Sequence, residues 1–158
     1  GIRLGITGSE AAARAYLEMM AEIAAKAPAA RLEGAMVEQM APRGQEVIVG
    51  MRRDGNFGPL VMFGFGGVYV ELFADVSFRI PPISVAEAGA MIMETRAGKL
   101  LAGYRGSEPA DVDAVADVIR RLGQIALDHP EISEIEINPL VVYPRGQGVL
   151  ALDCRALF

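Results

Sequence analysis

Three oxygen-bearing side chains near the end of the chain have the types and spacing of a metal site. Two β-like runs, 132–143 and 148–154, flank the turn Pro144-Arg145-Gly146-Gln147. A hairpin with this turn at its tip places Asn138 opposite Asp153, and opposed residues share a face with Cβ atoms about 5 Å apart. Glu136, two residues before Asn138, points the same way. Oxygen ligands of this kind suit Mg²⁺, which takes one or two carboxylates and keeps water or phosphate in its other positions.

Spacing alone leaves a second interpretation of these residues open. They also fit the polar outer face of a half-solvated antiparallel sheet. Pro139 interrupts the hydrogen-bond ladder of the first run and can shift its register, which bears directly on the pairing of Asn138.

A glycine-rich stretch, Gly64-Phe65-Gly66-Gly67, is a second candidate for ligand contact. Glycines let a backbone approach phosphate closely, although an ordinary β-turn has the same composition. The sequence contains no Gly-Lys-Ser/Thr triplet of a P-loop, and no Rossmann fingerprint opens a helix after a strand.

Several charged residues near loops could meet a nucleotide. Glu38 and Glu46 flank the loop 40–44, where a carboxylate can accept hydrogen bonds from ribose hydroxyls or an adenine amino group. Arg79 and Arg105 lie near other loops and could meet phosphates. For each glutamate taken singly a solvated strand end is the more common case, and for each arginine a surface ion pair is the more common one.

The only histidine and the only cysteine of the sequence are not in positions typical of a catalytic base or nucleophile. His129, the only histidine, follows an amphipathic helix, where its charge suits the helix dipole. Cys154, the only cysteine, is expected to pack in the core. A single cysteine excludes an internal disulfide framework and a cysteine zinc cluster, and no Ser–His–Asp set is present.

The composition is that of one folded domain. The chain has 158 residues, 52% of them hydrophobic and 22% charged, with a net charge of -5. This charge argues against nucleic-acid binding, and no stretch has the length and apolarity of a membrane span or the pattern of a signal peptide. The expected location is the cytoplasm.

The pattern of elements predicts an α+β fold in which antiparallel hairpins pack with helices, and not a doubly wound parallel sheet. The turn Asp54-Gly55-Asn56 joins two strands in a hairpin, and Ser84 with Glu87 forms a capping box. The predicted helices are 10–26, 84–96 and 111–129, and 98–106 is predicted as a loop. The predicted strands are 2–6, 35–40, 46–53, 59–63, 68–72, 132–138 and 148–154.

Several collinear motifs resemble the ATP-grasp domain of ADP-forming acetyl-CoA synthetases, and more distantly the β subunit of succinyl-CoA synthetase. The resemblance covers nearly the whole chain, so that residues 1–158 are expected to form the carboxy-terminal part of a single ATP-grasp domain. The motifs are Val37-Glu38-Gln39-Met40, 44–50, 57–67, 75–79, Gly103-Tyr104-Arg105-Gly106 and Glu136-Ile137-Asn138-Pro139-Leu140.

The resemblance implies a role for each matching residue. Asn138 and Asp153 match the ligands of the Mg²⁺–nucleotide, with Glu136 beside them, and Glu46 matches the carboxylate that binds ribose. The remaining matches are a hinge that meets adenine, a glycine loop near the phosphates or the phosphorylated histidine, and two residues for phosphate contact. These are Glu38, Gln39, Met40 and Ala41 for the hinge, Gly66 and Gly67 for the loop, and Arg79 and Arg105 for the phosphates.

The resemblance also implies a reaction and partners. In this family acyl-CoA, ADP and phosphate give the free acid, CoA and ATP through an acyl phosphate and a phosphohistidine, with Mg²⁺ and ATP or ADP bound. The family's smaller amino-terminal lobe, its CoA-binding domain and its ligase domains are not in this sequence. The chain is thus expected to be a fragment without complete activity, which works with those domains in the same or a partner chain. A homo-oligomer is open, as is a regulatory module in a multidomain protein such as a fused protein acetyltransferase.

Overall fold

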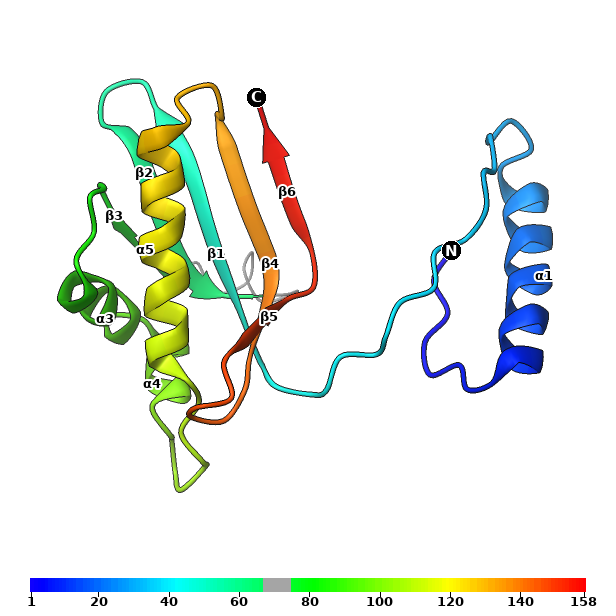
Figure 1. Ribbon diagram of the computed structural model, residues 1–158, viewed down its shortest axis with the longest axis horizontal. Coiled ribbons are helices and arrows are strands. Elements are labelled where there is room, and N and C mark those ends of the chain that lie inside the picture. Colours follow the sequence, from blue (N-terminus) through cyan, green and yellow to red (C-terminus); the bar gives the residue numbers. More distant parts are fainter. Residues whose placement is uncertain (67–74) are drawn as a thin grey trace. The chain divides into compact units, whose positions relative to one another are not determined.

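The chain divides into two compact units, Gly1–Pro42 and Arg43–Phe158, in a computed structural model of the protein. The structure describes residues 1–66 and 75–158. Figure 1 labels the helices and strands. All the described strands belong to the second unit, which also holds the candidate site at the end of the chain.

The first unit contains the helix α1 (Ser9–Lys26), which confirms the helix predicted at 10–26. An ion pair of 2.6 Å between Arg3 and Glu22 holds the segment before the helix to the helix surface. The strands predicted at 2–6 and 35–40 are wrong, since neither segment is in a strand. A strand needs a neighbour to satisfy its backbone N–H and C=O groups, and within this unit the regular element is a helix.

The second unit is built on an antiparallel sheet with the order β3-β2-β1-β4-β5, in which β6 continues beyond β5 along β4. Every described pairing is antiparallel, which confirms the predicted α+β class. The hairpin predicted around Asp54-Gly55-Asn56 is present as β1 and β2. The strands are β1 (Gln45–Asp54), β2 (Gly58–Phe65), β3 (Val76–Arg79), β4 (Glu134–Val142), β5 (Val149–Ala151) and β6 (Cys154–Leu157). The strand predicted at 68–72 lies outside the described residues.

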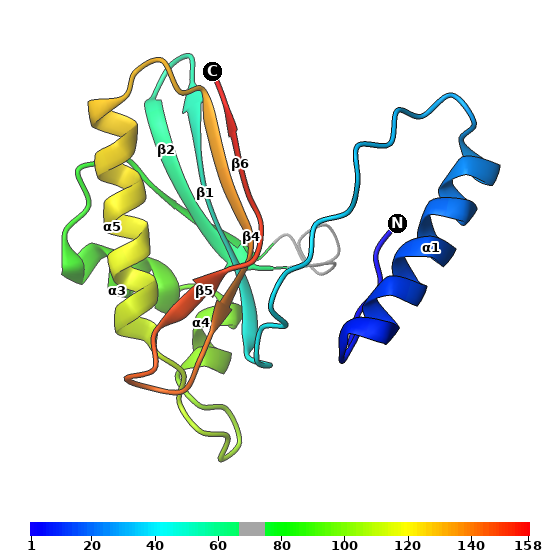
Figure 2. The same ribbon diagram turned by 45° about the vertical axis from the view of Figure 1, so that its right-hand side comes forward.

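The described helices of this unit, α3 (Val85–Met93), α4 (Arg96–Leu101) and α5 (Val112–Asp128), lie on one side of the sheet (Figure 2). The capping box of Ser84 and Glu87 is present at the start of α3. The predicted helix 84–96 ends earlier, because Thr95 caps a new helix by accepting a hydrogen bond from the N–H of Gly98. The loop predicted at 98–106 is therefore helical in its first part.

The core lies between these helices and the sheet. Alternate residues of β1 and β2 point into it, as the period of a strand requires, and Val49, Val61 and Phe63 have no exposed surface. The helix α5 contributes Val115 and Ile119, also fully buried. Each such side chain contributes about 1.5–3 kcal/mol by burial. The opposite face of the sheet carries the polar residues Glu136 and Asn138 of β4, together with the buried apolar residues Ile48 and Val141.

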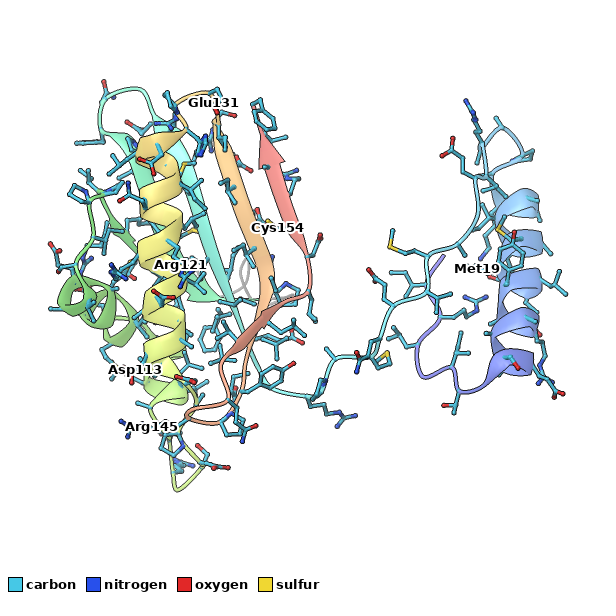
Figure 3. All side chains as sticks on the ribbon, in the orientation of Figure 1. Met19, Asp113, Arg121, Glu131, Arg145 and Cys154 are labelled. Carbon is cyan, nitrogen blue, oxygen red and sulfur yellow. The ribbon has the colours of Figure 1, made fainter. Side chains whose placement is uncertain are left out.

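Cys154 is exposed, so the prediction that it packs in the core is wrong. It lies on β6, whose four residues are all exposed. Figure 3 shows it on this strand, away from the helix α5 that covers β1 and β2. Among the described helices, none is both long and apolar enough to cross a membrane.

Candidate functional site

The last strands, β4 paired with β5 and β6, form a ribbon that we call the closing ribbon. Its register is the one that the sequence predicts. β4 pairs first with β5 and then with β6 in one continuous register. At the junction of β5 and β6, the N–H of Asn138 donates to the C=O of Asp153 at 3.1 Å. Asn138 is therefore opposite Asp153, and this geometric prediction is confirmed.

The shift expected at Pro139 occurs only on the side of β4 that pairs with β1. There the register changes by one residue between Val47 and Val49. Such a bulge reverses the alternation of the strand, so that Ile135 before it and Leu140 after it both belong to the core. Because of the bulge, both halves of β4 contribute side chains to the core that packs against the helices. Glu136 and Asn138 point to the other face of the sheet.

Four side chains on this face line a pocket of about 380 Å³: Glu136, Asn138, Asp153 and Arg155. The first two lie on β4, Arg155 lies on β6, and Asp153 directly precedes β6. The Asn138 side-chain nitrogen donates to a carboxylate oxygen of Glu136 at 3.3 Å, which orients both groups. The structure thus brings together the three residues that the sequence proposed as metal ligands.

The donor set of the pocket fits Mg²⁺. It offers the carboxylates of Glu136 and Asp153 and the amide oxygen of Asn138, all of them hard oxygen donors. Among the described residues, no group of three Asp, Glu, His or Cys side chains could hold a metal by itself. A cation here would therefore depend on the amide and on ligands from water or phosphate, as Mg²⁺ commonly does.

Arg155 is the pocket residue that the sequence analysis missed. It is paired in register with Glu136, and its guanidinium donates to Glu134 at 2.7 Å. The spacing in the sequence could have identified it, because Arg155 follows Asp153 by two residues and therefore shares its face. It gives the pocket a positive charge beside the carboxylates.

Asp111 fixes the turn that joins the two arms of the ribbon. One carboxylate oxygen caps α5 by accepting from the N–H of Ala114, and the other accepts from the N–H groups of Gly146 and Gly148 at 2.9 and 2.8 Å. The bond from Gly148 is the main cause that lowers the pKa of Asp111, and the bonds from Ala114 and Gly146 and the charge of Arg145 lower it further, whereas burial opposes them. The carboxylate therefore stays ionised and ties α5 to the ribbon.

Glu46 lies on the pocket's face of the sheet but outside the pocket lining. It is on β1, paired with Val141 of β4, and its side chain is exposed. Gly66 lies next to it, since its N–H donates to the C=O of Glu46 at 3.2 Å. A Cβ at Gly66 would lie 2.5 Å from the Val47 carbonyl oxygen, which explains the glycine structurally. Gly67 lies outside the described residues.

The two arginines proposed for phosphate contact lie elsewhere. Arg79 is paired with Val61 in register, on the helix-covered face of the sheet, and forms an ion pair of 2.5 Å with Glu94. Arg105 lies in the connection between α4 and α5, with its guanidinium 5.4 Å from the centre of the Tyr104 ring. The structure brings neither of them into the pocket lining, and their phosphate role stays a prediction.

The proposed adenine hinge, Glu38 to Ala41, belongs to the first unit. Its residues are in neither a helix nor a strand, and Glu38, Gln39 and Met40 are exposed. Exposed backbone of this kind can offer N–H and C=O groups to a ligand, but its role likewise stays a prediction.

His129 has the structural setting expected of it. It is the C-cap of α5, and its C=O accepts from Arg53 at 2.8 Å. The same guanidinium holds the carbonyls of Ala126 and Ile132, so that Arg53 fastens the end of the helix to β1. The ring of His129 lies 3.1 Å from Glu131 on the surface.

The profile of a family described as an ATP-grasp domain matches residues 1–157. The chain belongs to the ATP-grasp family. This confirms the fold that the collinear motifs implied.

The ATP-grasp chain is similar to ADP-forming acetate–CoA ligases. It is 45% identical over 150 residues to acetate–CoA ligase [ADP-forming] I of Archaeoglobus fulgidus. The aligned region is 95% of this chain and 22% of that protein. It is 44% identical over 157 residues to the β subunit of the Pyrococcus furiosus ligase I, which covers 99% of this chain and 67% of that subunit. The chain thus spans about a fifth of the first relative and two thirds of the second.

A solved structure has the same fold. The dinucleotide-forming acetyl-coenzyme A synthetase 1 of Ca. Korarchaeum cryptofilum, in complex with coenzyme A and Mg-AMPPCP, has a TM-score of 0.85 and 41% identity. The match covers 99% of this chain and 67% of that one. That synthetase therefore binds Mg-AMPPCP, the magnesium complex of a nucleotide analogue.

Proposed function

We propose that this chain is the nucleotide-binding part of an ADP-forming acyl-CoA synthetase, in which acyl-CoA, ADP and phosphate are converted to the acid, CoA and ATP. The observation that carries the proposal is the pocket in which Asn138 and Asp153, from two strands, face each other beside Glu136. The relatives named above act in this reaction class, and their CoA-binding and ligase functions would come from further domains of the intact protein. A cytoplasmic location agrees with a single cysteine.

In this proposal Asn138 and Asp153 hold Mg²⁺ together with the nucleotide phosphates, and Glu136 supports them. Asp153 suits the role because, among the described residues, its carboxylate has no hydrogen-bond or ion-pair partner that would compete for it. Bound Mg²⁺ would neutralise charge on the phosphates that are transferred. Glu46 lies further along the same face and is proposed to accept hydrogen bonds from the ribose.

The remaining proposed contacts are those with the adenine and the phosphates. The backbone of residues 38–41 would meet the adenine, and Gly66 with Gly67 would lie near the phosphates. The pocket itself contributes positioning and electrostatics, which are the main protein contributions to phosphoryl transfer.

The test is Asp153→Ala in the intact protein, with binding of Mg-ATP and Mg-ADP measured by calorimetry. We expect the substitution to abolish magnesium-dependent nucleotide binding with little loss of fold, because Asp153 is exposed and outside the core. Chelation of magnesium with EDTA should reduce binding by the wild type to the level of the variant.

Asp113→Ala is the matched control, because Asp113 is an exposed aspartate on α5, on the other side of the sheet (Figure 3). It should bind Mg-ATP like the wild type. An unchanged dissociation constant in Asp153→Ala would refute the metal role. Nucleotide binding without acid–CoA ligase turnover in the intact protein would favour a regulatory module.

A further inference from the structure

The pocket contains one basic side chain among acidic ones. Arg155 lines it together with Glu136 and Asp153, and its guanidinium is bonded to Glu134 at 2.7 Å. Glu134, Glu136 and Asn138 are alternate residues of β4 and therefore share one face. Arg155 thus sits at the end of a row of carboxylates that leads to the proposed metal ligands.

The side chain of Arg155 points away from these ligands but can reach them. Residues two apart on a strand are separated by about 7 Å, so Asp153 and Arg155 are neighbours on the same face. Glu134 lies on the far side, four residues or about 13 Å along β4 from Asn138. A rotation about the side-chain torsions of Arg155 would carry the guanidinium from Glu134 to the centre of the pocket.

The ion pair with Glu134 is weak enough to be exchanged. The Arg155 side chain is 62% exposed, and ion pairs of exposed side chains contribute little because water screens them. Arginine binds phosphate through two parallel hydrogen bonds, which are stronger than neutral ones. A phosphate group brought into the pocket with a metal ion would therefore compete well for this guanidinium.

We propose that Arg155 is a phosphate-binding residue of the pocket and that Glu134 is its resting partner, exchanged when a nucleoside di- or triphosphate enters with its metal. The proposal rests on the proposed function and adds a residue to it. It also provides a positive charge for the phosphates that the two carboxylates alone would repel.

The test compares Arg155→Met with the wild type in the intact protein, by calorimetric binding of Mg-ADP, Mg-AMPPCP and adenosine. We expect Arg155→Met to weaken both phosphate ligands about ten-fold or more, the usual effect of losing a hydrogen bond to a charged group. Adenosine binding should change less than two-fold. Arg155→Lys should recover part of the loss, because lysine keeps the charge but not the two parallel bonds.

The variant Glu134→Gln distinguishes two cases: Arg155 leaves Glu134 when the nucleotide binds, or Arg155 stays paired with Glu134. If Arg155 leaves Glu134 on binding, removal of that partner makes Mg-AMPPCP bind up to about five-fold tighter, and never weaker. Arg121→Met is the matched control, since Arg121 forms a similar exposed ion pair of 2.6 Å with Asp117 on α5. It should leave all three dissociation constants unchanged.

Each outcome decides one claim. Unchanged phosphate-ligand affinity in Arg155→Met, or an equal loss of adenosine binding, would overturn the role of Arg155. Glu134→Gln binding as weakly as Arg155→Met would show that Glu134 holds the guanidinium in place and would overturn the exchange. If the wild-type protein binds neither Mg-ADP nor Mg-AMPPCP, the proposed nucleotide-binding function itself is contradicted.

Discussion

Replacing Asp111 by alanine removes the carboxylate that joins the start of α5 to the turn of the closing ribbon. Asp111 is only 7% exposed and accepts three backbone hydrogen bonds, from Ala114, Gly146 and Gly148. The substitution therefore leaves three N–H groups without their acceptor. We expect a less stable second unit with a more mobile turn.

The magnitude follows from the kind of bond lost. Loss of the helix cap costs about 1 kcal/mol. Each bond from Gly146 and Gly148 contributes about 0.5–1.5 kcal/mol, since Gly146 is exposed and Gly148 is half-buried, so that water can replace the carboxylate. Together the loss is about 2–4 kcal/mol in the free energy of unfolding. Asp111→Asn should cost less, about 1–3 kcal/mol, because its amide oxygen can still accept from Ala114.

The effect should depend on pH. The pKa of Asp111 is lowered in the folded protein, chiefly by the hydrogen bond from Gly148. A carboxyl with a lowered pKa contributes its full stability above the unfolded value of about 3.9, and this contribution is lost as the pH falls through the folded value. The stability gap between wild type and Asp111→Asn should thus be constant from about pH 7 to 5 and shrink below about pH 4.

Urea unfolding followed by circular dichroism at several pH values measures this gap. Asp113→Ala on the same helix is the control and should cost at most about 1 kcal/mol, since its carboxylate acts only on the helix dipole. A loss below about 0.5 kcal/mol in Asp111→Ala, or a gap that does not change below pH 4, would refute the claim that the Asp111 carboxylate stabilises the junction of α5 and the turn.

Two further predictions concern the ligand and the core. Glu46→Ala should weaken nucleotide binding by about 1–3 kcal/mol if its carboxylate accepts from the ribose, and an unaffected dissociation constant in calorimetry would contradict that role. Gly98→Ala should destabilise the second unit by about 3 kcal/mol in urea unfolding, because its Cβ would lie 1.9 Å from the Ile92 carbonyl oxygen. Gly89→Ala, whose Cβ would meet nothing within 4 Å, is the control and should be neutral or stabilising.

The sequence was most informative where local chemistry determines structure. The capping box at Ser84, the turn after Asp54 and the register of the closing ribbon each depend on residues close together in the chain. The opposition of Asn138 and Asp153 could be predicted because one turn determines the pairing of both arms. The collinear motifs then supplied the family, which local patterns alone could not.

The errors arose where the outcome depends on distant neighbours. A β-like run such as 35–40 becomes a strand only beside a partner, and the sequence does not say whether one exists. The exposure of Cys154 follows from its place on a strand beyond the cover of the helices. Arg79 could not be assigned to a face without knowing that β3 pairs with β2, and that pairing places it beside Glu94.

Asp111 also limits how the ribbon can vary among related chains. The ladder itself would keep Asn138 opposite Asp153 with a longer turn, because added residues at the tip leave the paired residues in place. The two glycines that bond Asp111, however, lie in the connection 143–148 between β4 and β5. Turn length and helix cap should therefore be inherited together, and relatives that have lost the aspartate are those in which insertions at the tip should be tolerated.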